Sequence, residues 1–207
     1  MKLAKSIERL GTETAFEVLA KAKKLEAQGK DIVHLEIGEP DFETPDHIKE
    51  AAKKALDDNF THYVPSPGLM EVREVIAEHQ SEVHNKNISP ENVVFTPGAK
   101  PIMFFTIMAL IEPGDEVIYP NPGFPIYESM INYVGGKAIP MELKEEKGFN
   151  ADVDLIEQSI SDKTKLIILN SPNNPCGSVM ESSDMKRVAD IAKEKDIVIL
   201  TDEVYKD

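Results

Sequence analysis

Residues 166–170 read LIILN and residues 197–200 read IVIL. In both stretches apolar residues stand on consecutive positions, whereas a strand with one face in water alternates apolar and polar residues. Uninterrupted apolar runs are typical of strands whose sheet has helices on both faces. Between the two runs, Met185, Val188 and Ala192 recur at the spacing of one helix face. The order strand, helix, strand predicts a mostly parallel sheet in an α/β fold.

The same alternation extends back to about residue 90. The predicted strands are VVF, EVIY, KAIPM, LIIL and IVIL, and the predicted helices cover residues 102–111, 124–133, 155–160 and 185–195. Before residue 90 the pattern is mainly helical, with helices predicted at 6–28, from Thr44-Pro45 onward and at 69–84, and one short strand at 32–37. Gly29 is expected to end the first helix. We therefore predict a doubly wound domain preceded by a helical arm that docks elsewhere.

Composition narrows the classes of partner. Asp and Glu total 37 against 23 Lys and Arg, which gives a net charge of −14 and argues against binding to nucleic acid. No stretch approaches the roughly 18 apolar residues of a membrane span. The five histidines show no metal-binding spacing. One cysteine excludes an internal disulfide, and the first residues lack the features of a secretory signal, so the expected location is the cytoplasm.

The residues that follow the predicted strands should line a ligand site, because ligands of open α/β sheets bind beyond the carboxyl ends of the strands. TPGAK follows VVF and opens a helix, whose N-terminus favours a phosphate. An aromatic residue, Phe124, follows EVIY, and an Asn-rich loop follows LIIL. Asp202 and Tyr205 follow IVIL. Singly these are ordinary caps, turns and packing residues, but together they suit a flat, phosphorylated, cationic heterocycle.

Six ordered segments of the chain closely resemble one enzyme family. They are GEPDFETP (38–45), HYVPSPGL (62–69), TPGAK (96–100), NPGFPIY (121–127), NSPNNPCG (170–177) and DEVY (202–205). In this order they resemble the class I/II aminotransferases, which are fold-type-I enzymes dependent on pyridoxal 5′-phosphate (PLP). The resemblance covers essentially the whole chain and is strongest to the aspartate and aromatic amino-acid branch. It implies the large PLP-binding domain of that fold, truncated, with an N-terminal helical arm.

The resemblance also implies a role for individual residues toward the cofactor. The implied contacts are Gly98, Ala99 and Lys100 with the phosphate, Phe124 stacked on the pyridine ring, Asn174 and Tyr205 with the phenolic oxygen, and Asp202 with the pyridine nitrogen. Asp202 is the one catalytic residue implied in this chain, because a protonated ring nitrogen makes PLP a better electron sink. A pyridinium partner would also offset the cost of burying this carboxylate.

Two further residues are assigned by the resemblance alone. Tyr63 matches a tyrosine that reaches the phosphate from the other subunit, which implies a homodimer with shared sites. Gly38 matches a backbone position near the substrate carboxylate, and Asn174 is also expected near the substrate. Cys176 stands where the family usually has Thr. We interpret it as a small residue behind the loop, because no nearby histidine motif could activate it as a nucleophile.

The family's Schiff-base lysine and its substrate-binding arginine have no counterpart in this chain. We therefore expect the N-terminal portion of an aminotransferase, with residues 1–45 as an arm and part of the small domain, and 46–207 as an incomplete PLP-binding domain. The parent protein would transfer an amino group from an aspartate-like or aromatic amino acid to a 2-oxo acid. The chain alone should be inactive and poorly soluble, unless the missing C-terminal half accompanies it, because apolar surface and a strand edge remain open.

Three other interpretations stay open at this point. A related fold-type-I protein could use the same site as a lyase, a decarboxylase or a regulator without turnover. The chain could also be a non-catalytic short partner subunit. A plain nucleotide-binding module is a distant third interpretation, because the sequence contains no glycine-rich dinucleotide fingerprint.

Overall fold

The computed structural model describes residues 2–11 and 14–206, which form two compact units. The first unit combines Met1–Thr14 with Gly98–Asp207, and the second is Ala15–Pro97. The sequence-predicted domain boundary at residue 45 falls within the second unit, and a division there stays a prediction.

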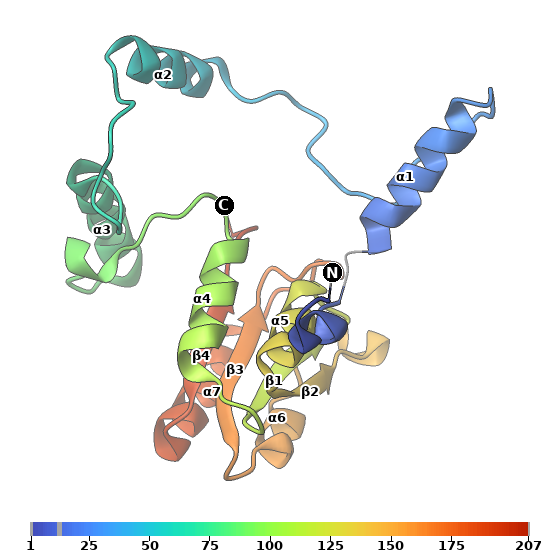
Figure 1. The fold of residues 1–207 in the computed structure, drawn as a ribbon. Coiled ribbons are helices and arrows are strands. Elements are labelled where there is room, and N and C mark those ends of the chain that lie inside the picture. Colours follow the sequence, from blue (N-terminus) through green and yellow to red (C-terminus); the bar gives the residue numbers. More distant parts are fainter. Residues whose placement is uncertain (1, 12–13, 207) are drawn as a thin grey trace. The chain divides into compact units, whose positions relative to one another are not determined.

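A four-stranded sheet forms the centre of the first unit (Figure 1). Its strands are β1 (Glu116–Asn121), β2 (Lys137–Glu142), β3 (Thr164–Asn170) and β4 (Val198–Asp202). All three pairings are parallel, in the order β2-β1-β3-β4. The predicted parallel sheet is confirmed.

Helices cover both faces of this sheet (Figure 1). On one face pack α4 (Lys100–Leu110) and α5 (Ile126–Val134), and on the other α6 (Val153–Ser159) and α7 (Ser182–Lys195). Along β3, Leu166 and Ile168 belong to the core with α4 and α5, while Ile167 and Leu169 belong to the core with α6 and α7. The consecutive apolar residues of LIIL are therefore explained by two separate cores.

The strand order reverses beside β1. From β1 the chain crosses to β2 on one side, then returns to place β3 on the other side of β1 and β4 beyond it. The loops that leave the carboxyl ends of β1 and β3 consequently run to opposite faces. In open α/β sheets such a reversal creates the crevice in which ligands bind.

The predicted helix at 6–28 is wrong as one continuous element. The chain forms a 3₁₀ helix, η1 (Lys5–Arg9), and separately α1 (Thr14–Glu26). Gly11 follows η1, and its backbone N–H and C=O both bond to Ser129 Oγ of α5, at 2.9 and 3.1 Å. These bonds replace the helical bonds that Gly11 would otherwise make. Residues 12 and 13 of the predicted helix lie outside the described part of the chain.

The second unit is helical. After α1 it contains α2 (Asp46–Asp57), α3 (Met70–His84) and the 3₁₀ helix η2 (Pro90–Asn92); η3 (Glu145–Lys147) belongs to the first unit. Gly29 follows α1 with φ of +83°, and Lys30 N donates to Leu25 O at 3.2 Å, so the predicted glycine cap is confirmed. Arg73 of α3 is buried and donates to Pro90 O and Val93 O, at 2.7 and 2.9 Å.

Two predicted strands, at 32–37 and 93–95, are wrong. Both segments are extended or irregular, and neither pairs with a strand in the described residues. Val33, Leu35 and Val94 are largely exposed. An apolar run becomes a strand only where a neighbouring strand supplies hydrogen bonds, and in the described part of the chain no strand lies beside these two segments. Within the described residues, no helix is both long and apolar enough to cross a bilayer.

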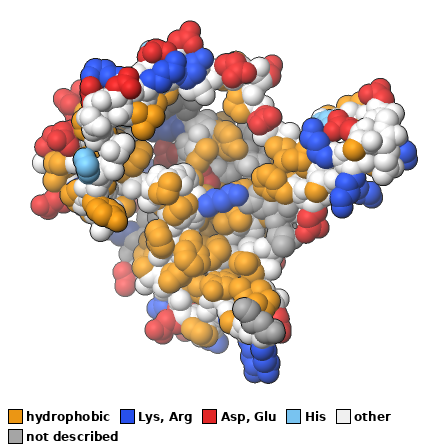
Figure 2. Space-filling view, turned by 45° about the horizontal axis from the view of Figure 1, so that its top comes forward, with side chains coloured by type: hydrophobic (Ala, Val, Ile, Leu, Met, Phe, Trp, Pro, Cys, Tyr) orange, Lys and Arg blue, Asp and Glu red, His pale blue; other side chains and the backbone are white. Residues whose placement is uncertain are grey.

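The first unit exposes apolar side chains on α4 and along β4. Ile102, Phe105 and Met108 of α4 are 42 to 58% exposed, although the opposite face of the same helix is buried. β4 is an edge strand, and Val198 is half-exposed. Hydrophobic side chains are widely visible on the face drawn in Figure 2. The expected open strand edge and apolar surface are both present.

Candidate cofactor-binding site

The loop after β1 places an aromatic ring at the carboxyl edge of the sheet. It contains a cis Asn121-Pro122 bond and reaches Gly123, where a Cβ would lie 2.2 Å from Pro120 O. Only glycine fits there, so the turn that carries Phe124 depends on it. The Phe124 ring meets Tyr127 edge-on, with centroids 5.9 Å apart and an interplanar angle of 84°.

The start of α4 lies beside this ring. Lys100 is the first residue of α4, and its Nζ lies 5.7 Å from the centroid of the Phe124 ring. Gly98, two residues earlier, has a φ of +88°, which favours glycine even though a Cβ would meet no atom within 4 Å. A cation, an aromatic face and the positive end of a helix dipole thus occur together.

The loop after β3 is held by hydrogen bonds from Asn170, the last residue of the strand. Its Nδ2 donates to Pro172 O at 3.1 Å and to Asp202 O at 3.0 Å. Its Oδ1 accepts from Asn174 N at 2.7 Å. The Ser171-Pro172 and Asn174-Pro175 bonds are cis. One buried amide therefore sets the path of the loop and ties it to the end of β4.

Asp202 ends β4, and two hydrogen bonds from described residues reach its carboxylate. Tyr127 OH donates to Oδ2 at 2.5 Å, and Val204 N donates to Oδ1 at 3.2 Å. Tyr127 is fully buried, and burial together with the Asp202 carboxylate raises the pKa of its phenol well above the ordinary value. The phenol therefore stays protonated at physiological pH and donates its hydrogen to Asp202.

The amide of Asn174 and the phenol of Tyr205 meet although they lie 31 positions apart. Asn174 Nδ2 donates to Tyr205 OH across 3.4 Å, and Tyr205 is 56% exposed. Both groups extend from the carboxyl ends of adjacent strands, β3 and β4. An amide and a phenol thus lie together at the carboxyl ends of β3 and β4, where both could hydrogen-bond one oxygen atom of a ligand.

Of the nine residues singled out from the sequence, seven belong to the first unit. They are Gly98, Ala99, Lys100, Phe124, Asn174, Asp202 and Tyr205. Contacts join Lys100 to Phe124 and Asn174 to Tyr205. Gly38 and the fully exposed Tyr63 belong to the second unit, and their roles stay predictions.

Cys176 lies in the loop after β3 and is partly buried. Its backbone N–H donates to Asn173 Oδ1 at 3.1 Å. Burial raises the pKa of its thiol, which disfavours the reactive thiolate. The interpretation of Cys176 as a small loop residue, not a nucleophile, agrees with this environment.

Sequence reasoning missed two residues that organise the site, Tyr127 and Asn170. Tyr127 stands three positions after Phe124 and lies in the first turn of α5, whereas Phe124 precedes that helix. Asn170 is the polar residue that directly ends the LIIL run. Each signal was visible, but the partners could not be read from the sequence because Tyr127 and Asp202 are 75 positions apart.

Known proteins with similar sequences and structures share one description. A family model for "Aminotransferase class I and II" matches residues 30–207. The chain is 39% identical over 204 residues to a probable aspartate/prephenate aminotransferase of Aquifex aeolicus, covering 99% of this chain and 52% of that protein. The chain thus spans about half the length of the relative.

Solved structures of aminotransferases also align with this chain. The aspartate aminotransferase of Thermus thermophilus with maleate aligns with a TM-score of 0.92 at 36% identity, over 97% of this chain and 53% of that one. An alanine aminotransferase of Pyrococcus furiosus aligns with a TM-score of 0.93 at 32% identity, over 99% and 52%. The family model covers most of the chain, and the strand-end motifs lie within the matched region. The chain belongs to the class I and II aminotransferases.

Proposed function

We propose that the full-length protein containing this chain is a PLP-dependent aminotransferase. It would transfer an amino group from an amino acid to a 2-oxo acid, and this chain would supply most of the cofactor contacts. The observation that carries the proposal is the Asp202 carboxylate, which Tyr127 OH holds at the carboxyl edge of the sheet. A fixed acid at a strand end, beside an amide, a phenol and an aromatic ring, suits a pyridinium ring.

The environment of Asp202 fits the cofactor's ring nitrogen. Each carboxylate oxygen accepts one protein hydrogen bond, from Tyr127 or from Val204. An ionised carboxylate has about four acceptor positions, so it can also accept the N–H of a protonated ring. Bound PLP supplies an electron sink, whose strength depends on that ring proton. Asp202 would hold the proton on the ring nitrogen, and Tyr127 would hold Asp202 in place.

The remaining residues would orient the ring from its other sides. Phe124 would lie flat against one face of the ring. Lys100 and the backbone at the start of α4 would hold the phosphate, because a helix N-terminus and an ammonium group both favour an anion. Asn174 and Tyr205 would hydrogen-bond the phenolic oxygen, which agrees with their contact across 3.4 Å. The side chains thus define which way the ring faces.

The proposal includes parts that this chain does not contain. Relatives about twice as long as this chain support a second half that supplies the Schiff-base lysine and the carboxylate-binding arginine. A homodimer would bring Tyr63 to the phosphate of the other subunit, and Gly38 would lie near the substrate carboxylate. The cytoplasm is the proposed location. The relatives' names mention aspartate, prephenate and alanine, so they do not agree on one substrate. The amino donor is proposed as an aspartate-like or aromatic amino acid, as the sequence resemblance implies.

The test is a spectroscopic and product assay on the full-length protein with PLP. Addition of aspartate, an aromatic amino acid or alanine should shift the cofactor absorbance, and a 2-oxo acid should restore it with formation of the new amino acid. Release of carbon dioxide or ammonia in place of amino transfer would assign a decarboxylase or lyase and contradict the proposal. Absence of PLP binding would contradict it also. The 207-residue chain alone is expected to give no turnover.

A further inference from the structure

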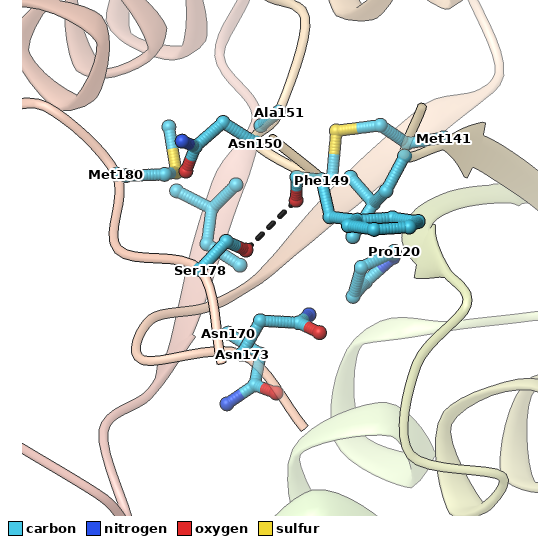
Figure 3. A pocket seen from close by; sticks show the side chains of 11 residues that line it. Pro120, Met141, Phe149, Asn150, Ala151, Asn170, Asn173, Ser178 and Met180 are labelled. Atoms are coloured by element: carbon cyan, nitrogen blue, oxygen red, sulfur yellow. Dashed lines mark hydrogen bonds between the residues drawn. The ribbon is translucent and has the colours of Figure 1, made fainter. Parts of the chain in front are cut away.

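A small cavity lies directly behind the loop that follows β3. It is lined by the ends of β1, β2 and β3, by residues 149–151 and by residues 173, 178 and 180 of the loop (Figure 3). Its volume is about 10 Å³, close to the space of one water-sized sphere. Ser178 Oγ donates to Phe149 O across 2.8 Å at its wall. The cavity therefore sits where the loop meets the segment between β2 and α6.

Two residues that line this cavity, Asn150 and Asn173, each carry a buried polar side-chain atom without a hydrogen-bond partner among the described residues. Among the described residues, neither Asn173 Nδ2 nor Asn150 Oδ1 has a hydrogen-bond partner. Asn173 is 6% exposed, and its Oδ1 accepts from Cys176 N, so the orientation of its amide is determined. One atom is a donor and the other an acceptor. Leaving either buried group unpaired costs about 1–3 kcal/mol.

We propose that this cavity is a binding site for a single water molecule that bridges Asn173 Nδ2 and Asn150 Oδ1. Water accepts from the first and donates to the second, so it satisfies both atoms at once. A cation cannot do so, because Asn173 Nδ2 carries only donor hydrogens and has no lone pair to offer it. Ser178 Oγ offers a third partner, since its hydrogen is directed to Phe149 O and its oxygen can still accept. Buried waters typically make about three such bonds.

The bridge would fix the loop from behind. Asn173 already clamps the loop, because its N–H donates to Ser178 O and its C=O accepts from Gly177 N, at 2.9 and 2.8 Å. Water would tie this clamp to Asn150, and the next residue after Asn173 is Asn174. Asn150 and Asn173 would therefore be positioning residues for the Asn174 amide. This consequence rests on the proposed function, whereas the water site itself does not.

The first test is a high-resolution crystal structure of the full-length protein. One spherical density peak within hydrogen-bond distance of both Asn173 Nδ2 and Asn150 Oδ1 is expected. A direct hydrogen bond between the two side chains, a dry cavity, or a metal ion in place of water would each overturn the proposal.

The second test compares two variants at one position. Asn150→Leu keeps a similar volume but removes the acceptor, so it should lose the density peak, lower the denaturation midpoint and weaken PLP binding about fivefold, the effect of one hydrogen bond. Asn150→Asp keeps an acceptor oxygen and should retain the peak, with PLP affinity near that of the unmodified protein. Equal PLP affinity in both variants would overturn the positioning role. If the unmodified protein binds no PLP, the proposed function fails, while the crystal structures still decide the water site.

Discussion

The loop after β3 and the segment after β4 both contribute to the candidate site, yet they are held in different ways. β3 is buried along almost its whole length, and Asn170 at its end makes three hydrogen bonds, two of them within its own loop. β4 is an edge strand, and Tyr205 beyond it is half-exposed. The Asp202 side chain has a single side-chain partner among the described residues, Tyr127 of α5.

This difference separates two kinds of contribution. The end of β3 has its shape determined largely by local bonds, so a change there should reduce stability first and function second. The end of β4 presents a carboxylate that is held by one side-chain contact from a distant helix and one bond from the backbone of Val204. A change there should reduce function while leaving the fold intact. Substitutions at the two strand ends can therefore show whether stability and function separate in this way.

Asp202→Asn should have the largest effect on function. Asn has the same shape but carries no negative charge, so it would leave a protonated ring nitrogen without its counter-ion. Loss of one partner of a desolvated charge pair costs about 3 kcal/mol, and kcat/KM of the full-length protein should fall about a hundredfold or more. Steady-state transamination kinetics measure this loss, and the denaturation midpoint should change little.

Asp196→Asn provides the matched control. Asp196 lies just before the opposite end of the same strand and has a φ of +56°, a conformation that Asn also tolerates. The Asp196→Asn substitution removes the same charge far from the candidate site and should leave kcat/KM unchanged. If both variants lose activity equally, net charge and not the Asp202 contact is responsible.

Asn170→Ala should mainly affect stability. The substitution removes three hydrogen bonds and leaves the partly buried Asn174 N–H without its partner, which should cost about 2–3 kcal/mol of unfolding free energy. Denaturant titration of the full-length protein measures the cost, with Asn87→Ala at an exposed position as control. An unchanged midpoint combined with a large loss of PLP affinity would reverse the proposed contrast between the two strand ends.

Tyr127→Phe tests the side-chain hydrogen bond that helps to hold the Asp202 carboxylate. The ring fills the same buried space and keeps its packing on Phe124, but the hydrogen bond to the carboxylate is lost. A bond to a charged group contributes about 1.5–2 kcal/mol, so PLP affinity or kcat/KM should fall roughly tenfold. The raised pKa keeps the Tyr127 phenol protonated, so the ratio between the two proteins should stay constant from neutral to mildly alkaline pH.

Tyr133→Phe, on the same helix, is the control for this substitution. No hydrogen bond of the Tyr133 hydroxyl is recorded among the described residues, and the Tyr133 ring packs on Phe104. The Tyr133→Phe variant should match the unmodified protein in both PLP affinity and kcat/KM. A pH-dependent ratio for Tyr127→Phe would show that the phenol ionises, contrary to its environment.

The sequence pattern predicted the parallel sheet correctly, but two of the strands that it predicted do not form. LIIL and IVIL are apolar on consecutive positions because two helix layers cover them, and both form parallel strands. The runs at 32–37 and 93–95 carry the same local signal, yet no partner strand lies beside them in the described residues. Strand formation depends on that partner, which the local pattern does not contain.

The candidate site shows the same limit. Asp202, Asn174 and Phe124 could be proposed because each follows an apolar run and matches a family motif. Tyr127 was inside a quoted motif, but its role depends on reaching Asp202 across 75 positions. Asn170 was also inside a quoted motif, but no role was predicted for it. Local patterns thus locate the groups that could contact a ligand, whereas the groups that hold them become visible only in three dimensions.

Cys176→Thr should have the smallest effect. Cys176 is partly buried in the loop after β3, and its hydrogen bond to Asn173 Oδ1 is made by the backbone N–H. Because that bond does not involve the thiol, the change in unfolding free energy should be within about 0.5 kcal/mol. Because the thiol pKa is raised, alkylation at Cys176 should be slower than that of a free cysteine at pH 7–8, as measured by peptide mass. A rapid reaction there would place a thiolate in the loop, and the loop after β3 would then carry chemistry of its own beyond positioning Asn174.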